Sequence, residues 1–384
     1  MKNHTALLQK HMTMLCEIIG ARPTGSVENK AATDYVIEIL NTLGFNTHRQ
    51  EFDCIDWRNS GATLTIDGQD TPIQPAEYSL PCEIEAEFVC IDTLEALRKA
   101  DVSKKIAVLY GELCKEPLMP KGFVFYNPDE HKQIIALLEE KSPTAIITVS
   151  ATDEHIIQDG DFTIPCAVVQ QDSLDVFIQN VGRRARLSIK TERIPTQASN
   201  VIATYGSTDN TVCFTAHIDT KPTTPGALDN ASGVSVLLAL AEAVTSKEYP
   251  YRIEIALLNG EDYYSTPGEV VFMNELTPRY SLAVNVDGVG LKNNTTSVSF
   301  YDCPSSLEER ILESASHFGI ERIDPWPMGD HMIFASFGIP TIALTASSIF
   351  TLIGNTIHTP DDDMKNIDID ILDQVVQFLL DCIH

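Results

Sequence analysis

The sequence has few basic side chains for its length. Its 384 residues include 27 Lys and Arg against 54 Asp and Glu, which gives a formal net charge of −27. A surface of this charge repels phosphate backbones and anionic lipids, so we expect no nucleic-acid partner and no membrane partner. The composition, with 43% hydrophobic and 21% charged residues, is otherwise that of a globular protein with a core of ordinary size.

Signals for export, membrane insertion and disulfide bonding are also missing. The sequence has no window of about 18 apolar residues, and its first twenty residues lack the features of a secretory signal. Its nine cysteines are an odd number without any C-x-x-C pair, which argues against a disulfide framework and against a cysteine zinc knuckle. We therefore expect a cytoplasmic location.

The pattern of apolar residues changes twice along the chain. Amphipathic helices are predicted near residues 8–19 and 32–43. From about residue 60, short β-type runs appear (62–66, 106–110, 145–149 and 167–169), with one helix over residues 131–140. After residue 196, near-continuous apolar strands (212–216, 253–258, 282–286 and 341–344) alternate with helices (234–244 and 372–383).

This alternation predicts an α/β fold with a mostly parallel central sheet flanked by helices. We expect residues 1–58 and 196–384 to form one discontinuous domain. Residues 59–195 are then an inserted small β-rich domain.

Histidines and carboxylates follow the predicted strands, where open α/β sheets bind their ligands. His217 and Asp219 follow the first of these strands, Glu261 and Asp262 follow the second, and Asp287 follows the third. Two further residues join them: Asp229 precedes the helix at 234–244, and His358 precedes the last helix.

Crowded carboxylates repel one another, and a divalent cation relieves the repulsion. Imidazole and carboxylate ligands suit zinc first, then manganese, cobalt or iron. Two histidines and three aspartates can hold two ions about 3.5–4 Å apart if one carboxylate bridges them. Glu261 is then free to act as a general base on the bridging water.

Each of these residues also has an ordinary structural explanation. Asp229 can cap its helix, Glu261 and Asp262 can be solvated loop residues, and a His-x-Asp pair is usually a core or surface pair. Such separate explanations do not account for the fact that all the residues fall at the same edge of one predicted sheet.

The same motifs resemble, in this order, the signature of the co-catalytic di-zinc aminopeptidases of metallopeptidase family 28. The motifs are Arg22-Pro23-Thr24-Gly25-Ser26, His217-Ile218-Asp219, Gly226-Ala227-Leu228-Asp229-Asn230-Ala231-Ser232-Gly233, Gly260-Glu261-Asp262, Asp287, Gly329-Asp330-His331, Gly338-Ile339-Pro340 and His358-Thr359-Pro360. The inserted region resembles that family's protease-associated domain, and the whole fold is then a zinc exopeptidase fold.

The resemblance implies a role for each site residue. Asp229 bridges two zinc ions, with Mn²⁺ or Co²⁺ as alternatives. His217 and Asp287 complete one ion's ligands, and Asp262 and His358 complete the other's. The catalytic residues are Glu261, the general base, and Asp219, which orients His217.

The implied reaction is removal of the N-terminal residue from peptides with a free N-terminus, by attack of a metal-bridging hydroxide. Two positions depart from the family's pattern: Asp262 stands where Glu is usual, and Ile357 stands where Tyr often precedes the last histidine. Tyr263, Tyr264 and His331 are alternative oxyanion donors.

Several other functions remain as alternatives. The sequence contains no G-x-x-x-x-G-K-[ST], H-E-x-x-H or G-x-S-x-G motif. A carboxypeptidase or dipeptidase, a single-zinc glutaminyl cyclase, and a non-catalytic peptidase-like binding protein stay open.

Overall fold

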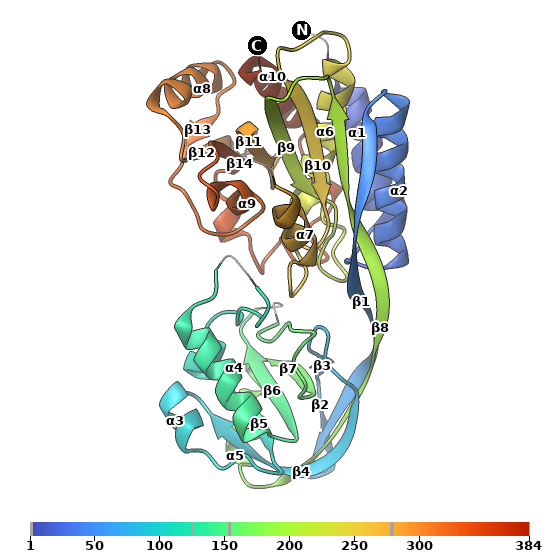
Figure 1. Ribbon diagram of the computed structural model, residues 1–384. Coiled ribbons are helices and arrows are strands. Elements are labelled where there is room, and N and C mark those ends of the chain that lie inside the picture. Colours follow the sequence, from blue (N-terminus) through green and yellow to red (C-terminus); the bar gives the residue numbers. More distant parts are fainter. Residues whose placement is uncertain (1–2, 124–125, 153–154, 277–279, 384) are drawn as a thin grey trace. The chain divides into compact units, whose positions relative to one another are not determined.

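The structure is a computed structural model that describes residues 3–123, 126–152, 155–276 and 280–383 (Figure 1). The chain divides into two compact units, Met1–Cys54 with Thr196–His384 and Ile55–Pro195. Two long strands, β1 (Asn46–Ile66) and β8 (Arg184–Tyr205), contribute residues to both units. Each unit has hydrophobic core residues of its own.

A mixed sheet forms the centre of the first unit. In spatial order its strands are β13 (Glu321–Arg322), β12 (Thr296–Tyr301), β14 (Thr341–Ala346), β11 (Tyr280–Val286), β9 (Thr211–His217), β10 (Arg252–Leu258) and β8. The four strands β14, β11, β9 and β10 are parallel, whereas β12 and β8 pair antiparallel at their two sides. Nearly every residue of the parallel strands is buried, which explains their near-continuous apolar sequences.

Helix α6 (Ser232–Val244) packs on β9, β10 and β11. Helices α1 (Thr5–Thr13), α2 (Val27–Thr42) and α10 (Ile369–Cys382) in turn contact α6. Because α6 is covered in this way, it is apolar on almost all sides. The other helices of this unit are η1 (Met14–Ile19), η4 (Ala227–Ala231), α7 (Pro267–Glu275), α8 (Ser305–His317), α9 (His331–Ala335), η5 (Ile349–Thr351) and η6 (Met364–Asn366).

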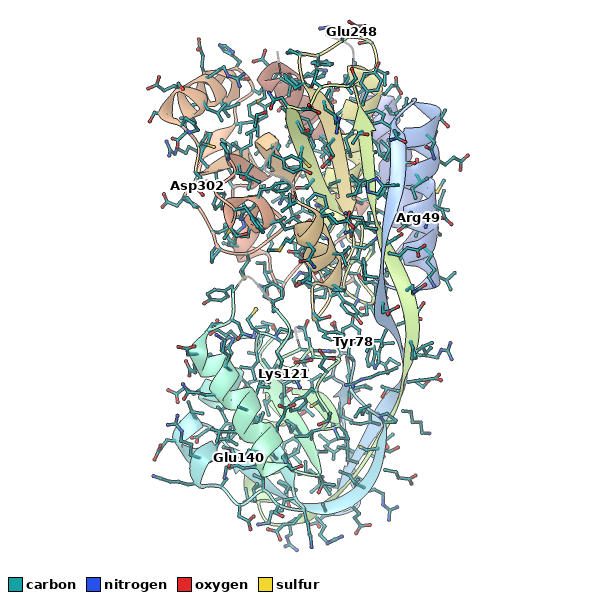
Figure 2. The ribbon with its side chains drawn as sticks, in the orientation of Figure 1. Arg49, Tyr78, Lys121, Glu140, Glu248 and Asp302 are labelled. Atoms are coloured by element: carbon teal, nitrogen blue, oxygen red, sulfur yellow. The ribbon has the colours of Figure 1, made fainter. Side chains whose placement is uncertain are left out.

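Polar contacts fix α2 at its start and along its length. The Ser26 hydroxyl accepts the backbone N–H of Asn29 at 3.0 Å, which caps the first turn. Arg49, which lies on β1 (Figure 2), forms an ion pair with Asp34 of α2. The helix is thereby joined to the strand that follows it in sequence.

Contrary to the expectation from the sequence, one helical segment among the described residues, Ala227–Val244, is by length and composition apolar enough to cross a membrane. Its mean hydropathy is 1.4, and 83% of it is buried inside the protein. This burial is what a core helix of a globular fold shows.

The second unit has its own parallel strands and two hydrophobic clusters. Strands β4 (Cys82–Ile91), β5 (Ile106–Leu109), β6 (Ala145–Ser150) and β7 (Cys166–Gln170) pair in parallel, and β3 (Gln74–Pro75) pairs antiparallel with β7. The first half of β8 pairs antiparallel with β4, and β2 (Gln69–Thr71) forms a hairpin with β1. The helices of this unit are α3 (Leu94–Lys99), η2 (Gly111–Cys114), α4 (Asp129–Lys141), η3 (Gln171–Ser173) and α5 (Leu174–Gln179).

The predicted α/β fold with a mostly parallel central sheet is confirmed. The predicted strands over residues 212–216, 253–258, 282–286 and 341–344 correspond to β9, β10, β11 and β14. The sequence prediction missed β4, because Glu83, Glu85 and Glu87 interrupt its apolar residues. These glutamates lie on a strand that pairs with β8, where Arg184 and Arg186 form ion pairs with Glu85.

Candidate metal centre

The predicted site residues lie at the carboxyl ends of the parallel strands. His217 is the last residue of β9, and Asp287 directly follows β11. Glu261 and Asp262 follow β10 within four residues of its last residue, Leu258. Parallel strands end at one edge of a sheet, so these side chains converge there.

Three of these residues form one group of potential ligands. The Nε2 atom of His217 lies 3.0 Å from Oδ1 of Asp229 and 3.6 Å from Oδ1 of Asp287. Ligand atoms of these residues lie within 4.8 Å of one another, so they could hold a metal ion.

A second group shares Asp229 with the first. The Nε2 atom of His358 lies 3.2 Å from Oδ2 of Asp229 and 3.3 Å from Oδ1 of Asp262. The two carboxylate oxygens of Asp229 therefore face two different histidines. All five predicted ligands are brought together, in two groups joined by one carboxylate.

Asp219 lies closer to His217 with its backbone than with its carboxylate. Its carbonyl oxygen lies 3.1 Å from His217 Nδ1, whereas its carboxylate oxygen Oδ1 lies 3.7 Å away. The carboxylate accepts hydrogen bonds from Thr24 Oγ1 at 2.7 Å and from the backbone N–H of Asp262 at 3.2 Å. Asp219 thus connects the loop after β9 to the loop after β10.

Glu261 lies beside the first group without joining it. Its Oε2 atom is 4.0 Å from His217 Nε2, and its side chain is 22% exposed. Burial, together with the negative charges of Asp262 and Asp287, raises the pKa of Glu261 well above its ordinary value. The residue is placed to hold a proton next to the potential ligands.

Opposite charges shift the pKa values of the ligands themselves. Burial alone would lower the pKa of His217, but the nearby carboxylates of Asp219, Asp229 and Asp287 outweigh this effect, and the pKa lies well above the ordinary value. Burial would raise the pKa of Asp229, but the two histidines hold it below its ordinary range. Burial raises the pKa of Asp287.

The donor set fits a divalent metal ion. His217 Nε2 and Asp262 Oδ2 are buried atoms that have no hydrogen-bond partner. A cation at the two groups would satisfy both atoms and offset the repulsion between the carboxylates. Imidazole nitrogen and carboxylate oxygen are ligands typical of zinc.

Two further buried carboxylates near the site had no predicted role. Burial, with the charge of Asp287, raises the pKa of Asp330 to about 7, and neither of its carboxylate oxygens has a hydrogen-bond partner. Glu269 of α7 is 1% exposed, and burial and the charge of Asp330 raise its pKa well above the ordinary value. Sequence alone gives no signal for Glu269, because its first-turn position in α7 is equally typical of a solvated helix start.

Ile357, which stands where the family often has Tyr, is buried, and so are the three alternative oxyanion donors. Ile357 is 3% exposed and belongs to the hydrophobic core of the first unit. Tyr263 and Tyr264 are buried, and their ring centroids are 4.3 Å apart. His331 Nε2 lies 3.1 Å from the carbonyl oxygen of Trp326, and burial lowers the pKa of His331 to about 4.

Comparisons with known proteins agree with this arrangement. The sequence profile of Peptidase family M28 matches residues 200–383. The aminopeptidase YwaD of Bacillus subtilis (strain 168) is 24% identical over 390 residues, which cover 94% of this chain and 80% of that protein. The probable lipoprotein aminopeptidase LpqL of Mycobacterium tuberculosis is 25% identical over 252 residues, which cover 62% of this chain and 48% of LpqL. The chain thus spans about half the length of LpqL.

Solved structures share the fold along almost the whole chain. The zinc aminopeptidase BSAP of Bacillus subtilis superposes with a TM-score of 0.78 at 19% identity, covering 98% of this chain and 94% of BSAP. A glutaminyl cyclase of Porphyromonas gingivalis shares the fold less closely, with a TM-score of 0.54 at 16% identity and coverage of 99% and 96%. None of these comparisons tests the protease-associated identity of the insertion. The cytoplasmic location also stays a prediction, and one relative is described as a lipoprotein.

The profile match covers the segment that carries all five potential ligands, and the shared fold extends over the remainder of the chain. The resemblance found in the motifs is therefore confirmed for residues 200–383, the segment that matches the profile of Peptidase family M28.

Proposed function

We propose that the protein is a zinc-dependent aminopeptidase, which removes N-terminal residues from peptides. The observation that carries this proposal is the pair of ligand groups that share Asp229, with Glu261 beside them. The proposal assigns catalysis to the domain of residues 1–58 and 196–384, and it treats residues 59–195 as a protease-associated-like insertion.

In this proposal two zinc ions bind per chain. His217 and Asp287 would hold one ion, Asp262 and His358 would hold the other, and Asp229 would be available to both. The opposite orientation of the two Asp229 oxygens, each 3.0–3.2 Å from a different histidine, supports a shared carboxylate. When bound, the ions supply Lewis-acid chemistry that polarises a peptide carbonyl and activates water.

Glu261 is the proposed general base. Its Oε2 atom takes a proton from water and delivers it to the amine that leaves the cleaved bond. A carboxylate with a raised pKa is suited to both steps, because it holds a transferred proton more readily than an ordinary glutamate does. Asp219 holds His217 in place through the hydrogen bond at Nδ1, and this contact leaves Nε2 facing the metal.

The charge of the site favours a substrate with a free α-amine. The side chains of Glu261 and Asp287 are 22% and 26% exposed, so they face the approaching substrate. A protonated amine is attracted to these carboxylates, whereas an acetylated N-terminus carries no charge. This attraction supports an exopeptidase acting at the amino end.

The proposal can be tested by mass spectrometry of products from a peptide pool. Each peptide is supplied free and N-acetylated, and a subset begins with glutamine. The zinc-loaded protein is compared with Glu261→Gln and with Glu309→Gln, a control at an exposed acidic residue of α8. We expect stepwise loss of N-terminal residues from free peptides with the wild type and the control only.

Other outcomes would contradict the proposal and indicate a different function. Cleavage of acetylated peptides would indicate a carboxypeptidase or an endopeptidase. Loss of ammonia from the peptides that begin with glutamine, without cleavage, would indicate a glutaminyl cyclase. No product from any peptide would leave a peptidase-like binding protein.

A further inference from the structure

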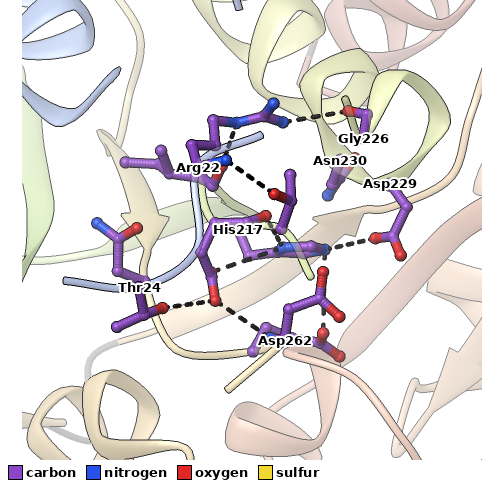
Figure 3. A network of polar contacts seen from close by, with 12 residues as sticks. Arg22, Thr24, His217, Gly226, Asp229, Asn230 and Asp262 are labelled. Atoms are coloured by element: carbon purple, nitrogen blue, oxygen red, sulfur yellow. Dashed lines mark hydrogen bonds and ion pairs between the residues drawn. The ribbon is translucent and has the colours of Figure 1, made fainter. Parts of the chain in front are cut away.

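Arg22 is a fully buried arginine whose guanidinium, among the residues that the structure describes, hydrogen-bonds to five backbone carbonyls. Its Nε donates to the carbonyl of Ile218 at 2.6 Å, directly after His217. Its two terminal nitrogens donate to the carbonyls of Pro225 at 2.7 Å and Gly226 at 3.1 Å, shortly before Asp229 (Figure 3). Nη1 also reaches the carbonyls of Leu15 and Gly20.

Asp362 holds the same segment through its amide groups. The carboxylate of Asp362 accepts the backbone N–H of Leu228 at 2.8 Å and that of Asp229 at 3.1 Å. Its own carbonyl accepts the N–H of Ala227 at 3.1 Å. Asp362 is fully buried and lies four residues after His358.

The segment between these contacts cannot be held by regular helix bonding alone. Gly226 has a φ of 57°, and Asp229 has non-helical angles of φ −119° and ψ 88°. A Cβ at Gly226 would lie 2.4 Å from the carbonyl oxygen of Asp229 and 2.3 Å from the side chain of Thr220. The backbone is therefore tightly folded just where it must present the Asp229 carboxylate.

We propose that Arg22 and Asp362 are positioning residues that fix the direction of the Asp229 carboxylate between the two histidines. Arg22 holds the carbonyl groups that precede Asp229, and Asp362 holds the amide groups. Through Ile218, Arg22 also ties this segment to the residue after His217. The inference rests on the proposed function, since it takes Asp229 and His217 to be metal ligands.

The chemistry of the two side chains explains why these residue types occur here. A guanidinium is a planar fork of five donors, so one side chain can reach carbonyls on separate segments. A lysine ammonium keeps the charge but gathers its donors on one atom. An ionised carboxylate accepts two amides at once, whereas an asparagine side chain has only one oxygen to accept them.

The test uses Arg22→Lys and Asp362→Asn in the full chain, with Leu379→Ala as a matched control. Leu379 is fully buried in α10, so its truncation lowers stability without touching the site. Zinc dissociation constants are measured by competition with a chromogenic chelator, well below the melting temperature of each metal-free protein. Cobalt-loaded samples report coordination geometry through their visible absorption bands.

We expect both positioning variants to bind zinc about 10–100-fold more weakly than the wild type, with altered cobalt spectra. The control should lose melting temperature but keep its zinc affinity and spectrum. Wild-type zinc affinity and spectrum in both variants would overturn the inference and leave the proposed function standing. A wild-type protein that binds no zinc would overturn both, and zinc binding without peptide cleavage would contradict only the proposed function. If one variant does not fold, the other decides.

Discussion

The charge of Asp330 should make the metal-free protein less stable as the pH rises. Burial, with the charge of Asp287, raises the pKa of this carboxyl from 3.8 to about 7, so the folded state holds its proton more tightly than the unfolded state. Its contribution to stability is therefore greatest at low pH and falls as the pH rises from about 4 to about 7. At 1.36 kcal/mol per pKa unit, this one group costs the folded state about 2 kcal/mol between pH 5 and pH 7.

The substitution Asp330→Asn isolates this effect, because the amide keeps the shape and does not titrate. Unfolding free energies of wild type and variant are measured with urea at pH 5, 6 and 7 after zinc has been removed with a chelator. We expect the wild type to lose about 2 kcal/mol more than the variant over this range. The difference should shrink in zinc-loaded protein, since a nearby cation favours the ionised carboxylate.

Comparing how the unfolding free energy changes with pH in the wild type and in the variant separates the effect of Asp330 from other sources of pH dependence. The net charge of −27 also favours the folded state at lower pH, but it acts almost equally on both proteins. If the unfolding free energies of the metal-free wild type and of Asp330→Asn change equally with pH, the reasoning is refuted.

Three further substitutions test separate parts of the site. Glu261→Gln should retain zinc but lower kcat by about 10²–10⁴, the usual contribution of positioned proton transfer, and an unchanged kcat on an aminoacyl anilide would exclude it as the base. Asp229→Ala should lose metal, measured by elemental analysis after dialysis; full retention of both ions would remove its shared role. Thr24→Val deletes the 2.7 Å hydrogen bond to the Asp219 carboxylate and should lower the unfolding free energy by about 1.5–3 kcal/mol, with zinc still bound. An unchanged urea midpoint would show that this contact contributes nothing to stability.

The sequence was sufficient to predict the residues at the strand ends. The parallel strands are apolar throughout, so the first polar residue after each one is conspicuous, and His217 and Asp287 were found in this way. Asp229 and His358 lie outside the strands. The order of the motifs predicted that they lie close to the other site residues.

The contacts that support the site could not be predicted in the same way. Arg22 acts on carbonyls about 200 residues away in sequence, and backbone carbonyls carry no residue-type signal. Asp362 stands between two other aspartates, and nothing in a run of three shows which one is buried. Asp219 was expected to orient His217, but the sequence does not show that its backbone carbonyl lies closer to the ring nitrogen than its carboxylate does. These contacts of Arg22, Asp362 and Asp219 become visible only when the path of the folded backbone is known.

The split of the first unit between Met1–Cys54 and Thr196–His384 affects the order in which a ribosome can complete the protein. The second unit leaves the ribosome as one uninterrupted stretch, whereas helices α1 and α2 must wait for α6 before they can pack against it. His4 bonds Asp373, and His358 and Asp362 likewise follow the second unit in the sequence. A nascent chain therefore cannot assemble both ligand groups until His358 has been translated, long after the second unit has left the ribosome.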